Sequence, residues 1–272
     1  MKKIKIVSAI LLLACGLTII VYFCLNINCF QAKELVEAIR NNDVDSVDKI
    51  VKLNPECVNV LPQTQIEQIL CFVCQGTEAE YPLTEACRYH NFQIIQRLIG
   101  AGADVNLHTH MNTALSLTYE CKADNWYSVS QYLISNGADL DYEISYGGVL
   151  EDIVIRGYDC TEEEEEMVLN AFLYALENCD HSKVDWYQVL RKSAVYDRIQ
   201  IVEFLLENGY CDVNASFSGY TVLMSAAKEG SPKTIQLLLN NGADKSLVDF
   251  SGKTAYDYAV EYGKEDNAEL LK

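Results

Sequence analysis

The residues of this sequence best placed for chemistry are Cys71 and Cys74, which have the CxxC spacing of a redox pair or half a metal site. A thioredoxin-like pair lies at a helix N-terminus that follows a strand, because the helix dipole there lowers the pKa of the attacking thiol. Here the pair belongs to an apolar, helix-like stretch, and the sequence has no second CxxC. We therefore expect packing rather than catalysis. A thiol redox protein using Cys71 and Cys74 remains the less favoured alternative.

Two further groups of polar residues could bind a metal ion. His108 and His110 would point to one side of an extended segment, but no cysteine or carboxylate stands at ligand spacing from them. Thr161 precedes the acidic run 162–166, which lacks the alternating oxygen ligands and the glycine of a calcium loop. That run instead predicts a helix start, with Thr161 as N-cap and Glu164 completing a capping box. No Ser-His-Asp, phosphate-loop or metalloprotease pattern occurs, so we expect no enzyme, no cofactor and no metal.

Eleven cysteines are many for a chain of 272 residues. If the protein is exported, disulfides can form, but their pairing cannot be read from the sequence. Cys87 falls where a small residue would pack between helices. We favour cysteine as a small apolar filler and leave disulfides open.

The balance of charge limits the class of partner. Lys and Arg number 21 and Asp and Glu 39, which gives a net charge of −18. Nucleic acid is therefore not an expected partner, because phosphate binding needs a basic face. A basic protein is compatible, since complementary fields steer association.

Residues 1–30 differ from the rest of the chain. Lys2, Lys3 and Lys5 precede or open an apolar run at 4–25, which is long enough to span a bilayer as a helix. The lysines favour a cytoplasmic amino terminus, so we expect an uncleaved signal anchor and place the remaining residues on the periplasmic side of a bacterial inner membrane. The alternative is a lipoprotein signal, because Cys15 follows Leu12-Leu13-Ala14 as in a lipobox.

The elements that would position any site are clearest at 221–249. Thr221 is an expected N-cap, and a helix rich in small residues ends at Gly230, where we expect the left-handed conformation that glycine adopts without steric cost. Pro232 suits the first turn of a second helix, whose apolar face repeats at i, i+3 and i+4. Such a helix pair cannot bury its own apolar face and needs stacked neighbours.

This stretch resembles the ankyrin repeat, through Gly219, Thr221, Leu223, Ala226-Ala227, Gly230, Leu238-Leu239 and Gly242-Ala243-Asp244. The resemblance implies an all-α ankyrin-repeat solenoid of about seven helix-turn-helix units with short hairpin fingers, over residues 31–272, preceded by one transmembrane or signal-anchor helix. In one unit Tyr81 and Thr84 replace the usual threonine and histidine, so we expect a less braced turn there. The predicted units are 31–59, 60–106, 107–141, 142–185, 186–214, 215–246 and 247–272.

The resemblance also implies that a partner binds to variable positions on the fingers and first helices. Exposed Tyr and Phe, which are enriched in interface hot spots, fall on several of these positions. The expected partner-binding residues are Arg88, Tyr89, Thr109, His110, Asn112, Phe217, Ser218, Tyr220, Lys228, Glu229, Phe250, Ser251, Lys253, Tyr258, Glu261 and Tyr262.

The sequence thus predicts non-catalytic protein binding. Tethered, exported ankyrin proteins of this build are similar to the immunity partners of some phospholipase effectors of the type VI secretion system. The sharper interpretation is therefore an immunity protein that neutralises a toxic effector. The alternative within binding proteins is a periplasmic scaffold or stress-accessory protein.

Overall fold

The computed structural model describes residues 27–62, 80–108, 112–120, 124–141, 148–155 and 162–272, which fall into two compact units. Unit 1 ends at Ala138 and unit 2 begins at Asp139. The signal-anchor prediction and Cys15, Cys71, Cys74 and Thr161 lie outside the described residues. In the part of the chain that is described, no helix is long and apolar enough to cross a membrane.

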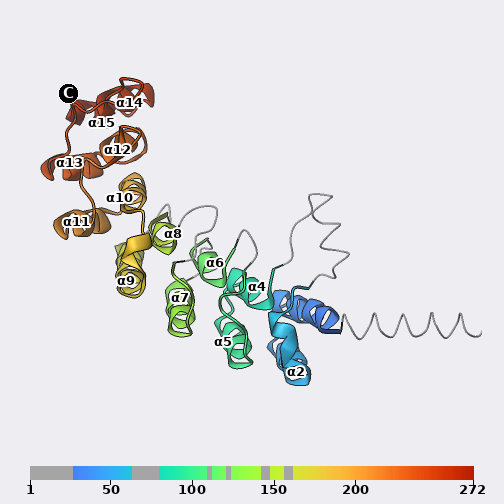
Figure 1. Ribbon diagram of the computed structural model, residues 1–272. Helices are drawn as coiled ribbons and strands as arrows, with labels where there is room; N and C mark the ends of the chain where they lie inside the picture. The colour runs from blue at the N-terminus through green and yellow to red at the C-terminus, as the bar shows by residue number, and fades with distance from the viewer. Residues whose placement is uncertain (1–26, 63–79, 109–111, 121–123, 142–147, 156–161) are drawn as a thin grey trace, which may run out of the picture. The chain divides into compact units, whose positions relative to one another are not determined.

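Unit 1 is built from pairs of helices (Figure 1). The first member of one pair lies beside the first member of the next, as α4 and α6 show. Its helices are residues 27–40, α2 (Val44–Leu53), the short 3-10 helix η1 (Pro55–Asn59), α4 (Pro82–Arg88), α5 (Phe92–Gly100), α6 (Ala114–Glu120) and α7 (Trp126–Ser135).

Unit 2 repeats the same arrangement, with α10, α12 and α14 in one row and α11, α13 and α15 in the other. A single two-stranded hairpin is present among its described residues. The elements are α8 (Val149–Ile155), α9 (Glu162–Asn178), η2 (His181–Lys183), α10 (Trp186–Val195), α11 (Ile199–Glu207), β1 (Ser216–Phe217), β2 (Tyr220–Thr221), α12 (Val222–Glu229), α13 (Pro232–Asn240), α14 (Ala255–Glu261) and α15 (Glu265–Leu271).

Small residues on the first helices let neighbouring helices approach closely. Ala226 and Ala227 in α12 are fully buried, as is Ala259 in α14. Cys87 occupies the same kind of position in α4, where burial raises the pKa of its thiol and keeps it neutral. Of the cysteines in the described ranges, all are free thiols, so Cys87 acts as a small apolar filler.

The turns that end the second helices are tied to one another by side-chain amides. Asn59 Nδ2 donates to the carbonyl of Gly102 at 2.9 Å, and Asn214 Nδ2 donates to that of Gly242 at 3.2 Å. Gly242 takes the left-handed conformation, with φ 87°. Asn59 and Asn214 therefore each bond one helix pair to the next within their own unit.

Two local expectations were wrong. Gly230 has φ −74° and ψ −177°, which is extended backbone rather than the left-handed conformation. Glycine is required there by space: a Cβ would lie 2.8 Å from the carbonyl oxygen of Ala194. The turn at Tyr81 is braced after all, because the Thr84 hydroxyl donates to the Tyr81 carbonyl at 2.7 Å.

Candidate functional site: an aromatic surface on unit 2

One finger in the described part of unit 2 is the hairpin β1–β2. Ser216 pairs with Thr221, and Phe217 with Tyr220. Ser218 and Gly219 between them have φ 52° and 78°, as a two-residue hairpin turn with the twist of its strands requires. Gly219 is also needed for space, because a Cβ there would lie 3.2 Å from the Cα of Asp249 in the next finger. Phe217 is left 70% exposed at this finger.

The second finger, residues 249–254, is held by one carboxylate. Asp249 Oδ1 accepts the backbone N–H of Ser251 at 2.8 Å and that of Lys253 at 2.9 Å. Its Oδ2 accepts the Tyr258 hydroxyl at 2.7 Å. These bonds, that of Tyr258 first, lower the pKa of Asp249. The backbone of this loop is thus fixed, while the side chain of Phe250 within it stays 85% exposed.

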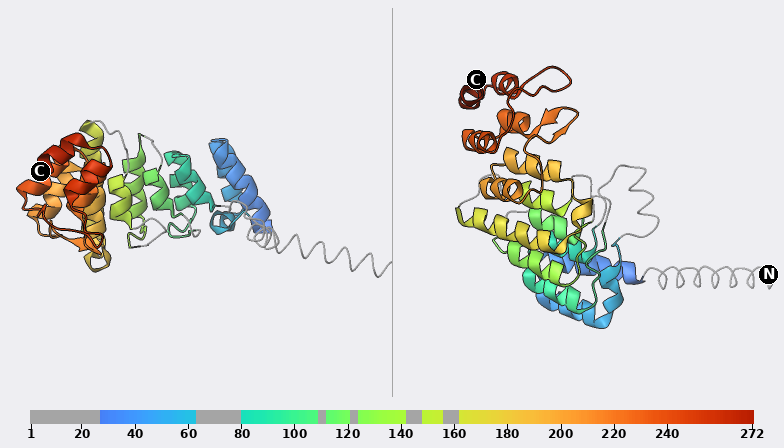
Figure 2. Two further views of the ribbon diagram at one scale, coloured as in Figure 1. Left: turned by 90° about the horizontal axis from the view of Figure 1, so that it is seen from above. Right: turned by 60° about the vertical axis from the view of Figure 1, so that its left-hand side comes forward.

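Both fingers project from the same edge of unit 2 (Figure 2). Below them, the rings of Tyr220 and Tyr258 meet edge to face, with centroids 5.1 Å apart. Such pairs add about 0.5–1.5 kcal/mol beyond area burial. Thr254 caps α14, accepting from Asp257 N–H at 3.3 Å, which fixes the direction in which Tyr258 leaves the helix.

Two lysines near these fingers each pair with a carboxylate and an aromatic ring of the same chain. Lys228 Nζ lies 4.7 Å from the ring centroid of Tyr262 and 2.8 Å from a carboxylate oxygen of Glu229. Lys253 Nζ lies 5.5 Å from the ring centroid of Tyr258 and 2.7 Å from Glu261 Oε2. The carboxylates are the first cause of the raised pKa of each lysine.

We call the set Phe217, Tyr220, Phe250, Tyr258 and Tyr262 the aromatic surface. The rings of Tyr220 and Tyr258 and the backbone of both fingers are already held in place, so little of their conformational entropy is lost when a partner binds. Tyrosine and phenylalanine supply large contact areas of this kind in protein interfaces. The described residues hold no group of His, Cys, Asp and Glu that could bind a metal ion.

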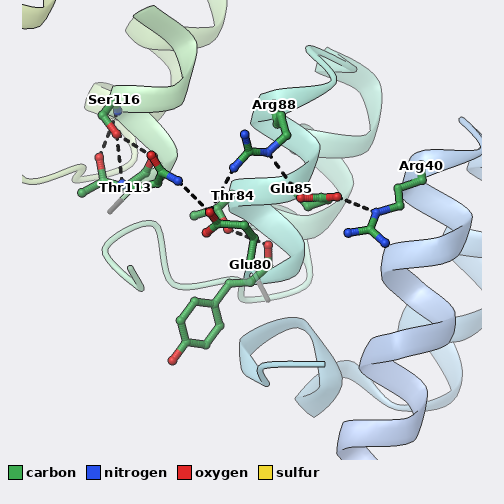
Figure 3. Close-up of polar contacts among 9 residues, drawn as sticks. Arg40, Glu80, Thr84, Glu85, Arg88, Thr113 and Ser116 are labelled. Carbon is green, nitrogen blue, oxygen red and sulfur yellow. Dashed lines mark hydrogen bonds and ion pairs between the residues drawn. The ribbon is translucent and has the colours of Figure 1, made fainter. Parts of the chain in front are cut away.

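The expected partner-binding residues of unit 1 behave differently (Figure 3). Glu85, which is buried, lies between Arg40 Nε at 2.6 Å and Arg88 Nε at 3.6 Å. Arg88 Nη2 also reaches Glu80 Oε1 at 3.0 Å, and Asn112 Nδ2 donates to the same oxygen at 2.7 Å. Arg88 and Asn112 therefore brace neighbouring helices.

The remaining expected site residues are placed as follows. Tyr89, next to this network, is 51% exposed. Thr109 and His110 lie outside the described residues, and His108 is exposed. In the acidic run, Glu165 bonds to the guanidinium of the buried Arg198, whose Nε donates to the Val154 carbonyl at 2.9 Å.

Sequence reasoning missed Tyr187 and Asp249. The Tyr187 hydroxyl donates to the Tyr220 carbonyl at 2.7 Å and so supports the aromatic surface from α10. Nothing in the sequence singles out that contact, because it joins two repeats. Asp249 could have been found, since Asp before a short loop that contains Gly often accepts from N–H groups of that loop.

Comparisons with known proteins agree with this geometry. A family model described as "Ankyrin repeats (3 copies)" matches residues 160–249 and 190–272, and one described as "Ankyrin repeat" matches residues 80–110. No curated protein sequence matches the chain. Ankyrin repeats are therefore confirmed, and the fold is a mostly helical ankyrin-repeat solenoid.

Several solved structures are similar. EF0377, an ankyrin repeat protein, shares 27% identity over 70% of this chain and 95% of its own, with a TM-score of 0.53. The human ASB11 ankyrin repeat domain shares 20% identity over 88% and 97%, with a TM-score of 0.61. The complex of the Bdellovibrio bacteriovorus endopeptidase Bd0816 with immunity protein Bd3460 gives 22% identity over 88% and 96%, at a TM-score of 0.46, too low to support any argument.

The class of protein follows from the repeats. Ankyrin repeats form protein–protein interaction modules, and the fold is generally not enzymatic.

Proposed function

We propose that this protein captures a specific protein partner through the aromatic surface of unit 2. The observation that carries the proposal is that exposed aromatic rings lie on fingers whose backbone is held in place. Phe217 and Phe250 are exposed on fingers that a hairpin turn and Asp249 hold in place, and Tyr262 is 51% exposed beside Lys228. Tyrosine and phenylalanine are enriched in protein interfaces, so rings presented in this way support binding to a protein.

We further propose that the protein is tethered to a bacterial inner membrane with its repeats on the periplasmic side. The support is the apolar run at 4–25 after a basic start. A reporter enzyme that is active only in the periplasm, fused after Lys272, tests this. Activity of a cytoplasm-specific reporter alone would contradict the proposed topology.

The sharper proposal is an immunity protein that neutralises a toxic effector, such as a phospholipase. It is supported by the combination of the proposed tether, the binding fold and a net charge of −18, which attracts a basic partner over long range. The partner would be held in the compartment where such an effector acts.

The test is capture of the full chain, solubilised in mild detergent from cells that produce it, followed by mass spectrometry. We expect one dominant protein that is lost with Tyr262→Ala. Tyr256→Ala is the matched control, because Tyr256 lies in α14, which ends directly before Tyr262, but it is outside the aromatic surface and near Lys272.

The captured protein is then produced alone and together with this chain. An immunity role predicts toxicity when it is produced alone and growth when both are present. A partner that is harmless on its own contradicts that role but leaves protein capture standing. A partner retained equally by Tyr262→Ala and Tyr256→Ala would rule out the aromatic surface.

A further inference from the structure

One connection in unit 2 is shorter than its neighbours. Residues 179–185 join α9 to α10 through η2 and span half as many residues as 208–221 and 241–254, which carry the fingers before α12 and α14. The chain therefore enters α10 without a finger of its own. Figure 1 shows α9 and α10 joined in this way beside α8.

A cavity of about 270 Å³ lies at this connection. By the same measure one water molecule needs ~10–15 Å³, so the cavity has room for a long side chain. Its lining combines the N-terminal residues of α8 and α10 with the short connection. The apolar part of the lining is Leu140, Val149, Leu150, Val184 and Val189.

Three carboxylates lie around this apolar lining, and two are matched by lysines. Lys183 Nζ lies 3.3 Å from Asp141 Oδ2, and Lys192 Nζ lies 2.5 Å from Glu151 Oε2. Asp185 is the third: its Oδ1 accepts the Gln188 N–H at 3.1 Å and so caps α10. Among the described residues no Lys, Arg or His lies within salt-bridge distance of Asp185, whose side chain is exposed.

We propose that this cavity receives one arginine or lysine side chain of the protein partner. The aliphatic stem would lie along the valines and leucines, and the cationic head would pair with Asp185. Arginine and lysine bury their stems on apolar surfaces while the charged head stays at the polar edge. A guanidinium can bond to the carboxylate oxygen that does not accept from Gln188.

This occupant fits the cavity better than the alternatives. An acidic side chain would meet an unmatched carboxylate, and a wholly apolar one would remove water from Asp185 without replacing its hydrogen bonds, which costs free energy. The net charge of −18 also favours approach of a basic segment. The inference rests on the proposed function, since it assigns part of the partner's chemistry.

The test uses small probes, so it does not depend on finding the partner. N-acetyl-arginine methylamide and N-acetyl-lysine methylamide are titrated into the full chain labelled at valine and leucine methyl groups, and methyl NMR spectra are recorded. The methyls of Val184 and Val189 report on the cavity, and those of Val248, exposed elsewhere in unit 2, are the control. We expect saturable shifts at the cavity with a Kd on the order of 1–10 mM, as befits a ligand of this size.

Two comparisons isolate the charge. The citrulline analogue has nearly the shape of the arginine probe but no charge, and we expect it to bind at least about tenfold more weakly. Asp185→Asn should weaken the arginine probe by a similar factor while keeping the cap, because Asn caps helices as well as Asp. The control is Asp244→Asn, since Asp244 accepts the Ser246 N–H at 2.9 Å in a similar turn and does not line the cavity.

Equal shifts with the arginine and citrulline probes, unchanged binding in Asp185→Asn, or no cavity shifts up to about 100 mM probe would each overturn the assignment. A partner captured through the aromatic surface would then still support the proposed function. Conversely, probe binding without any captured partner would support the cavity and count against capture.

Discussion

Gly230→Ala is the change that most directly tests how unit 2 is packed. The backbone of Gly230 is extended, a conformation that alanine also adopts. On backbone grounds alone the substitution should stabilise the protein by about 0.4–1 kcal/mol, because alanine restricts the unfolded chain.

The packing around Gly230 makes the substitution destabilising instead. A Cβ at this position would lie 2.8 Å from the Ala194 carbonyl oxygen and 3.0 Å from that of Ala226. Both are backbone atoms of helices that pack against each other, α10 and α12. Relief therefore means moving a helix, and overpacking of this kind costs about 1–3 kcal/mol. We expect a net loss of about 1–2 kcal/mol in the free energy of unfolding of unit 2.

Urea unfolding with fluorescence detection measures this loss, because each unit carries one tryptophan: Trp126 in unit 1 and Trp186 in unit 2. In a Trp126→Phe background, Gly230→Ala should lower the urea midpoint by about 0.5–1 M. Gly100→Ala is the matched control, measured through Trp126 in a Trp186→Phe background. Nothing lies within 4 Å of a Cβ there, so it should be neutral or stabilising. A midpoint for Gly230→Ala that is unchanged or raised would refute the argument from packing.

Three further predictions concern the same unit. Asn267→Ala should lower the free energy of unfolding by about 1–3 kcal/mol in the same urea assay, because the carbonyl oxygens of Ala227 and Gly230, 3.2 and 3.0 Å from the buried Asn267 Nδ2, would lose this donor. The pKa of Asp249 is lowered in the folded state, so ionised Asp249 stabilises the fold at pH values above its unfolded pKa. This contribution is lost as the pH falls through the folded pKa. Tyr258→Phe should therefore flatten the acid dependence of the melting temperature, measured from pH 6 to pH 2. Phe217→Ser and Phe250→Ser should change stability by less than about 0.5 kcal/mol, since both rings are exposed, but should weaken capture of the partner; a large fall in melting temperature would instead assign the rings to the fold.

The fold could be predicted because the repeat is local. Thr221 was expected to cap a helix, and its hydroxyl accepts the Met224 N–H at 3.2 Å. Pro232 was expected in the first turn of the next helix, and it begins α13. Both features depend on residues a few positions apart, so the sequence contains the information they need.

Features that join two repeats could not be predicted in the same way. Gly230 was assigned to the left-handed conformation because a glycine after a helix usually has that role. Its real constraint is a carbonyl from another helix, and no spacing within the sequence reveals it. Arg88 likewise matched a variable surface position, but Glu80 and Glu85 engage it. The position of Arg88 in the repeat indicates where its backbone lies, but not which groups its guanidinium contacts.

The net charge illustrates how far composition can be taken. Many of the acidic residues have local structural roles: Asp104, Asp139 and Asp244 each accept the backbone N–H two residues on, and Asp249 holds a finger. On the aromatic surface the lysines are matched by Glu229 and Glu261, so the charge there is close to balanced. In the proposed mode of binding, the overall field would set how fast a basic partner arrives, while its affinity would depend on the rings and on the unmatched Asp185 at the cavity. Net charge alone favours a kind of partner, but only the pairing of individual groups indicates where that partner binds.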